Sequence, residues 1–178
     1  MMGPSYATWI EGARRPGDAL TLALAGVLAQ GGIAGLAPEA LERLRRRHFP
    51  AVTAAQAACV TSPGGGCAAL RADEAADLIA LLLDHASADD EDTRWLAQAI
   101  ATACLKDNHL WQDMGLPSRD ALSLVLAQYF GALYQKNTRN MKWKKFFYKE
   151  LCARADVPLC KAPSCAVCAD FAACFGAE

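Results

Sequence analysis

The chain has 178 residues, 53 % of them hydrophobic and 21 % charged, and its formal net charge is −1. These values are typical of a folded protein, exclude a largely disordered chain, and allow one domain with a sizeable core. A net charge this close to zero indicates neither nucleic acid nor a membrane as the partner.

Helical signals predominate from the N-terminus onward, and no stretch alternates apolar and polar residues as a strand would. The first apolar run, Ala19–Ala29, follows Asp18 and ends before Gly31, as expected for a helix. Arg14 and Arg15 before this run loosely imitate an export signal, but the run is too short for a bilayer span of about 20 residues. We therefore expect an ordinary first helix and a cytoplasmic, reducing compartment, in which clustered cysteines favour metal binding over disulfides.

Further helices are expected along the rest of the chain. They are 38–48, 72–86, a helix that follows the acidic residues 89–92 and carries Trp95 to Ala103, 117–129, and 141–155. The helix at 38–48 should end before Pro50, because the residue before a proline avoids the α region. The sequence thus predicts an all-α fold: a single domain over residues 1–178 with about six helices and an irregular cysteine-rich tail at 155–178.

The tail contains four of the eight cysteines, Cys160, Cys165, Cys168 and Cys174, spaced C-x4-C-x2-C-x5-C. Thiolates this close together form a soft, anionic pocket suited to Fe–S clusters, zinc or other thiophilic metals. Structural zinc sites usually have two short cysteine pairs separated by a longer insert, whereas four ligands on one short loop fit a cubane-sized cluster. The spacing therefore favours an Fe–S cluster, with zinc, disulfides and unliganded thiols as alternatives.

The remaining cysteines suggest other roles. Cys59, Cys67 and Cys104 lie in alanine-rich surroundings and are interpreted as small core residues or incidental thiols. Cys152 stands eight residues before Cys160, at the end of the last expected helix. It is a candidate for the surroundings of the cluster, and packing at the helix end is the alternative.

A basic segment lies between residues 134 and 154, with seven cations and one anion, so it carries +6 and the rest of the chain −7. Its lysines are mixed with aromatic residues and are interpreted either as the solvated face of an amphipathic helix or as functional groups. As functional groups they would balance an anionic cluster, attract an oxyanion such as molybdate, or dock an acidic protein. We expect Lys144 and Lys145 to be exposed and to act through long-range charge.

His109 lies in a second polar and aromatic stretch, 108–113. It is interpreted either as a structural residue that caps a turn or as a functional group near the metal. In the second case Trp111 and Asp113 would hold the imidazole in one tautomer, as outer-shell partners do for metal ligands.

Several of these stretches together resemble the NifQ family of nitrogen-fixation proteins. They are HLWQDMGL at 109–116, Ser118-Arg119, MKWKKFFY at 141–148, Leu151-Cys152, and the cysteine tail ending in Cys174-Phe175-Gly176. The resemblance extends from about Trp95 to the C-terminus. The cysteine spacing alone names no family, and its combination with the basic aromatic helix makes the resemblance specific.

The resemblance implies a carrier rather than an enzyme: an Fe–S molybdoprotein that delivers molybdenum for biosynthesis of the nitrogenase iron–molybdenum cofactor. The ligands of its [3Fe–4S] or [4Fe–4S] cluster would be Cys160, Cys165, Cys168 and Cys174, with His109 and Cys152 as second-sphere residues or aids to molybdenum transfer. Implied partners are molybdate, the nitrogenase cofactor scaffold complex and the nitrogenase iron protein, with no nucleic acid and no membrane. The alternatives from other classes are a zinc-stabilised interaction module and a small Fe–S electron-transfer protein.

Overall fold

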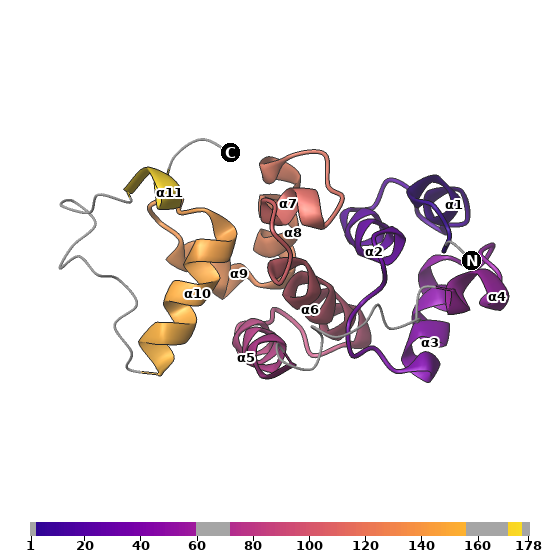
Figure 1. The fold of residues 1–178 in the computed structure, drawn as a ribbon, viewed down its shortest axis with the longest axis horizontal. Helices are drawn as coiled ribbons and strands as arrows, with labels where there is room; N and C mark the ends of the chain where they lie inside the picture. Colours follow the sequence, from indigo (N-terminus) through magenta and orange to yellow (C-terminus); the bar gives the residue numbers. More distant parts are fainter. Residues whose placement is uncertain (1–2, 60–71, 156–170, 176–178) are drawn as a thin grey trace.

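The structure is a computed structural model that describes residues 3–59, 72–155 and 171–175. All regular structure in these ranges is helical, which confirms the all-α prediction (Figure 1). The helices are α1 (Tyr6–Glu11), α2 (Ala19–Ala29), α3 (Pro38–His48), α4 (Ala54–Ala58), α5 (Ala72–Leu83), α6 (Glu91–Cys104), α7 (Leu110–Asp113), α8 (Arg119–Tyr129), α9 (Gly131–Lys136), α10 (Trp143–Arg154) and α11 (Phe171–Phe175).

The six longest of these helices, α2, α3, α5, α6, α8 and α10, are the six that the sequence predicts. Their ends agree closely with the expected ones, although α5 stops at Leu83 instead of residue 86. The prediction of about six helices is nevertheless wrong in number, because five short helices also form within the described ranges. Each has six residues or fewer, too few for an amphipathic period to be recognised in the sequence.

Local capping explains where the long helices begin. The Asp18 carboxylate accepts from the Thr21 N–H at 3.3 Å, and the Asp90 carboxylate accepts from the Thr93 N–H at 2.8 Å. These bonds satisfy N–H groups of the first turn that have no acceptor within the helix. Pro38 occupies the first position of α3, where no N–H is needed. These starting points are therefore readable from the sequence alone.

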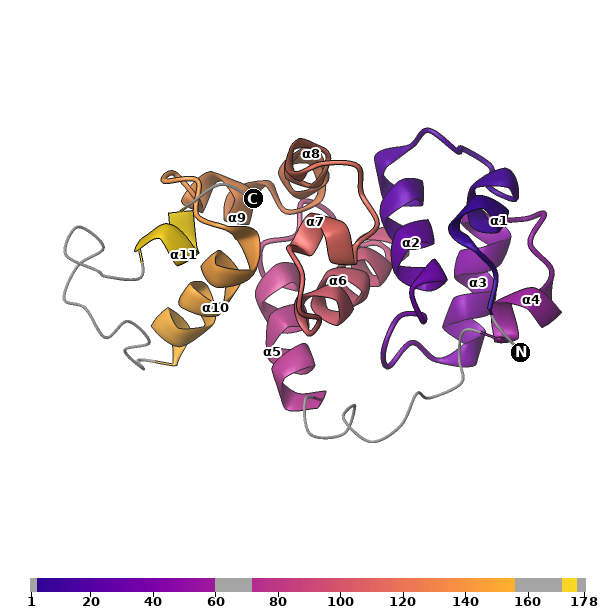
Figure 2. The ribbon, with the colours of Figure 1, turned by 45° about the horizontal axis from the view of Figure 1, so that its top comes forward.

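The helices form one elongated body (Figures 1 and 2). α1–α4 lie at one end, α5–α8 in the middle, and α9–α11 at the other end. α2 packs against α1, α6 and α8, while α10 packs against α5. The buried apolar side chains form one hydrophobic cluster that extends from Trp9 to Phe147, so the basic helix α10 belongs to the same core as the N-terminal helices.

A close backbone contact joins α2 to the segment that carries His109. A Cβ atom on Gly26 would lie 2.0 Å from the carbonyl oxygen of Met114, so only glycine allows this approach. Gly115 on the other side has φ +65°, the left-handed region that favours glycine. The two glycines therefore let α2 press directly against the end of the His109 segment and hold it in place.

Across the described ranges, no helix is both long enough and apolar enough to cross a membrane. The longest, α6, has 14 residues, whereas a span needs about 20.

Candidate functional site

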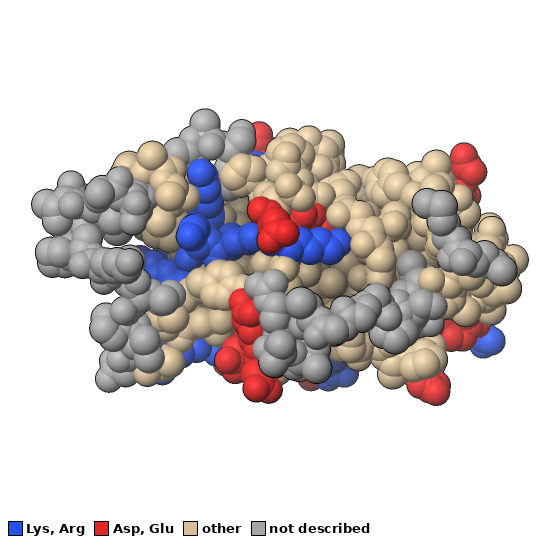
Figure 3. Space-filling model, in the orientation of Figure 1, with Lys and Arg blue, Asp and Glu red and all other residues tan. Residues whose placement is uncertain are grey.

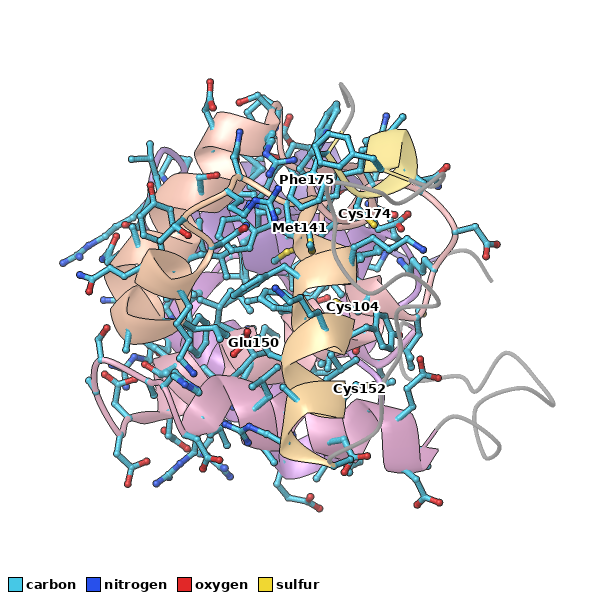
Figure 4. All side chains as sticks on the ribbon, turned by 90° about the vertical axis from the view of Figure 1, so that its left-hand side faces the viewer. Cys104, Met141, Glu150, Cys152, Cys174 and Phe175 are labelled. Carbon is cyan, nitrogen blue, oxygen red and sulfur yellow. The ribbon has the colours of Figure 1, made fainter. Side chains whose placement is uncertain are left out.

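α11 packs the end of the cysteine tail against the start of α10 (Figure 4). The Lys142 N–H donates to the Cys174 carbonyl oxygen at 2.8 Å, and the Arg139 guanidinium lies 5.0 Å from the centre of the Phe175 ring. Cys174 itself is partly buried and packs against the hydrophobic core. Because Cys174 lies in a helix, the expectation of an irregular tail is wrong for residues 171–175.

The other three predicted ligands, Cys160, Cys165 and Cys168, lie outside the described residues, so the ligand set stays a prediction. Within the described ranges, no three or more His, Cys, Asp or Glu side chains gather into a metal site. Among the four predicted cluster ligands, Cys174 is the one that lies within the described residues.

Cys152 is partly buried on α10, toward the opposite end from Cys174 (Figure 4). Ten residues separate it from Lys142, which corresponds to about 15 Å along the helix axis. Since Lys142 is hydrogen-bonded to Cys174, the structure does not bring these two cysteines together.

His109 does lie near the tail, because it lines a polar pocket beside α11. The volume of this pocket is about 520 Å³. Its walls include Asp107, Asn108, His109, Lys142, Lys144, Lys145 and Ala173. We call it the lysine pocket. Ala173 precedes Cys174 in α11, so the pocket joins three features that the sequence shows separately: the His109 stretch, the basic segment and the end of the cysteine tail.

A buried ion pair holds one wall of the lysine pocket. The Asp113 side chain is 2 % exposed, and its Oδ2 lies 2.5 Å from Lys144 Nζ. The same carboxylate accepts from the Asn108 backbone N–H at 3.1 Å and from the Asn108 side-chain amide at 3.0 Å. Lys144 also donates to the Lys106 carbonyl oxygen at 2.7 Å. These bonds attach the loop before α7 to α10 and set the position of His109.

This arrangement corrects two expectations. The sequence predicts an exposed Lys144, but its side chain is only 17 % exposed and its charge is offset by Asp113. The sequence also suggests that Trp111 orients the His109 ring, but the buried Trp111 indole N–H has no acceptor among the described residues. The Asp113 carboxylate accepts from Asn108 and Lys144, so it holds the loop and the helix together.

Several other cations of the basic segment are also paired. Lys136 Nζ lies 3.3 Å from Glu150 Oε2. Arg154 Nη1 lies 2.7 Å from Asp84 Oδ2. Lys145 and Lys149 are exposed and have no ion partner among the described residues. Figure 3 shows basic side chains gathered on the face where α10 lies, with acidic side chains lying among them.

Cys104 lies at the end of α6, fully buried, which confirms its interpretation as a small core residue. Burial raises the pKa of the Cys104 thiol to about 12; the nearby positive charge of Lys144 lowers this pKa slightly, and the negative charge of Asp113 raises it slightly. It therefore stays protonated at neutral pH and is a poor metal ligand, because thiolates rather than thiols bind metals. Cys59 is partly exposed at the end of α4, and Cys67 lies outside the described residues.

A second polar pocket has no counterpart among the sequence predictions. It has a volume of about 570 Å³, and its walls include Arg14, Arg15, Asp18, Arg47, His48 and Asp92. We call it the arginine pocket. No sequence signal could have found it, because its residues come from separate stretches of the chain and meet only after α2, α3 and the start of α6 have packed together.

The fold and the site together define a class: an all-helical protein in which the end of a cysteine-rich tail packs beside a lysine-lined pocket. Comparison with known proteins gives the family. The NifQ family profile matches residues 18–176, and the chain belongs to the NifQ family. Membership implies a role in nitrogen fixation and in the handling of molybdenum.

Relatives with this name share much of the sequence. The chain is 40 % identical to Protein NifQ of Azotobacter vinelandii over 151 residues, which covers 81 % of this chain and 77 % of the relative. It is 44 % identical to Protein NifQ of Rhodobacter capsulatus over 98 residues, 55 % of this chain and 54 % of that one. A NifQ homolog of Sinorhizobium fredii is 39 % identical over 146 residues, 80 % of this chain and 60 % of the relative. No solved structure matches the chain.

Proposed function

We propose that this chain is an Fe–S molybdoprotein that binds molybdenum and delivers it for biosynthesis of the iron–molybdenum cofactor. Its ligands would be Cys160, Cys165, Cys168 and Cys174, which hold a [3Fe–4S] or [4Fe–4S] cluster. Family membership supports the general role. The structural observation that carries the proposal is the packing of Cys174 against the start of α10, beside the lysine pocket.

The donor set suits such a cluster. Thiolates are the usual ligands of iron in clusters, and molybdenum is likewise thiophilic. A cluster of three irons uses three thiolates and leaves one cubane corner for a further metal, which the fourth thiolate can cap. The group carries negative charge, and exposed Lys145 together with Lys142 places positive charge beside Cys174. Nearby cations stabilise thiolates, so this end of the molecule favours an anionic metal site.

The proposed role is transport rather than catalysis. A carrier has to bind its metal firmly and then release it, which is easier near a chain end than within a packed core. We propose the nitrogenase cofactor scaffold complex as the recipient, with the nitrogenase iron protein taking part, and the cytoplasm as the compartment. Neither a nucleic acid nor a membrane enters the proposal.

Cysteine variants purified without oxygen test this function. Cys165→Ser and Cys168→Ser should lower bound iron and remove the molybdenum that stays bound through purification, because they break the closest chelating pair of the tail. The helical circular dichroism should not change. Cys59→Ser and Cys152→Ser serve as matched controls, and both should keep wild-type iron. Metal analysis and the visible absorption of thiolate-bound iron are the measurements.

The same measurements separate the alternatives. A colourless protein with about one zinc would identify an interaction module instead. A coloured protein with iron but without affinity for molybdenum would identify an electron-transfer protein. Full iron and molybdenum in either tail variant would show that Cys165 and Cys168 are not ligands.

A further inference from the structure

We propose that the lysine pocket is a binding site for a tetrahedral oxyanion, molybdate, which it holds before the metal reaches the tail thiols. The inference rests on the proposed function for the identity of the anion, because dissolved molybdenum at neutral pH is this dianion. It adds a site without any thiol, formed by the described residues of α10, α11 and the segment before α7.

The pocket presents the donors that such an anion needs. A tetrahedral oxyanion can only accept hydrogen bonds, and the Lys142 and Lys145 ammonium groups each have three donors. The His109 imidazole lines the same pocket from a different part of the chain. Lysine binds phosphate-like anions as a compact positive charge, without the planar geometry that arginine imposes. Donors from two elements around one cavity favour a bound anion over a merely solvated lysine face.

The charge balance at the pocket favours an anion. Lys144 is offset by Asp113, which lies outside the pocket wall and is 2 % exposed. Lys142 and Lys145 have no carboxylate at ion-pair distance among the described residues. Asp107 contributes one negative charge to the wall, which the two positive charges of Lys142 and Lys145 exceed. The dipole of α10, which begins at Trp143 without a side-chain cap, adds to the same positive potential.

The size and the place of the pocket agree with this role. A volume of about 520 Å³ lies within the usual range of small-ligand sites of about 300–1,000 Å³. It leaves room for water molecules that bridge the anion to more distant polar groups. Ala173 belongs to the wall and the Lys142 N–H is bonded to the Cys174 carbonyl, so the pocket lies beside the residue that precedes the last tail thiol in the chain.

Molybdate titration of the full-length chain tests the proposal, with binding measured by equilibrium dialysis and metal analysis. The wild type and the Cys165→Ser/Cys168→Ser double variant should both bind molybdate, because the pocket needs no thiol. Lys145→Gln should weaken binding by about tenfold, the scale of one lost hydrogen bond to a charged group. Lys149→Gln, one turn further along α10 and outside the described pocket wall, is the matched control and should bind as the wild type does.

Two more variants should change the affinity for molybdate in opposite directions, and the melting temperature checks folding. Asp107→Asn should tighten molybdate binding, because it removes a negative charge from the wall. His109→Asn should weaken it while keeping a residue type that is favourable at a helix start. Lys145 is exposed, so its variant should melt at the wild-type temperature, and a loss of binding cannot then be assigned to unfolding.

Four results would overturn the oxyanion site. The first is wild-type binding in both Lys145→Gln and His109→Asn. The second is an equal loss in Lys149→Gln, which would indicate general charge attraction. The third is loss of binding in the double cysteine variant, which would mean that molybdenum goes directly to the thiols. An effect of Lys145→Gln on the docking of an acidic protein, with unchanged molybdate binding, would also overturn it. Absence of iron from the wild type would instead contradict the proposed function. The molybdate titration would still decide whether the lysine pocket binds the oxyanion.

Discussion

The arginine pocket and the lysine pocket each have a histidine in the wall, and the two histidines lie in different surroundings. In the arginine pocket, His48 Nε2 lies 2.9 Å from Asp92 Oδ1, and Arg47 Nε lies 3.1 Å from the same oxygen. The His48 ring also packs edge-on against Trp95, with ring centres 5.9 Å apart. His48 and Arg47 are therefore engaged by a carboxylate of the pocket wall itself.

In the lysine pocket, the carboxylate that pairs with a lysine, Asp113, does not line the cavity. Asp113 is buried, takes the charge of Lys144 alone, and leaves Lys142 and Lys145 facing the cavity. Among the described residues, three arginines line one pocket and three lysines line the other, yet the two pockets differ in how many of these cations are already paired with a carboxylate. The position of the carboxylates decides the difference, and the number of cations in a stretch of sequence does not reveal it.

The largest expected effect comes from removing the buried carboxylate. Asp113→Asn leaves the mostly buried Lys144 ammonium without a counter-charge, so the free energy of unfolding should fall by about 3–5 kcal/mol. Asp92→Asn in the arginine pocket should cost only about 1 kcal/mol, because the Arg47 guanidinium is half exposed and remains solvated by water. Urea denaturation followed by circular dichroism gives both values. Equal losses would remove the distinction between the two pockets.

A smaller effect is expected where α2 meets the His109 segment. Gly26→Ala gains helix propensity, but its Cβ would overlap the backbone oxygen of Met114, which has no free rotation to move aside. We expect a net loss of about 1–3 kcal/mol, the usual cost of overpacking. Thermal unfolding measures it. Gly17→Ala is the control, since a Cβ added there would meet no atom of the described residues within 4 Å, and a similar loss there would contradict the contact.

The smallest expected effect is on the melting temperature at acidic pH, and it comes from Glu42 on α3, beside the arginine pocket. Hydrogen bonds from Arg45 and then Arg46 lower the pKa of Glu42 from 4.5 to about 2. A lowered folded-state pKa means that this stabilisation is present above pH 4.5 and is lost as the pH falls toward 2. Glu42→Gln should therefore flatten the decline of the melting temperature between these values. Glu39→Gln, on the same helix, should leave the slope unchanged, and an effect of equal size there would contradict the assignment.

The sequence is a reliable guide wherever a local signal exists. Asp18 and Asp90 mark the starts of α2 and α6 as N-caps, and Pro50 marks the end of α3, because each acts within one turn of backbone. The short helices escape prediction because four to six residues contain no full amphipathic period. One of them, α11, determines where Cys174 lies.

The family, the six long helices and the chemistry expected of the cysteine tail were readable from the sequence by itself, because they depend on residue types, local caps and short spacings. Only the tertiary structure decided which lysines are available. Lys144 and Lys145 are neighbours in sequence, but successive residues of a helix point about 100° apart. The packing of α10 against the segment that carries Asp113 pairs this carboxylate with Lys144 and leaves Lys145 exposed. Contacts between such distant parts of the chain follow from the packed core, and no local pattern specifies them.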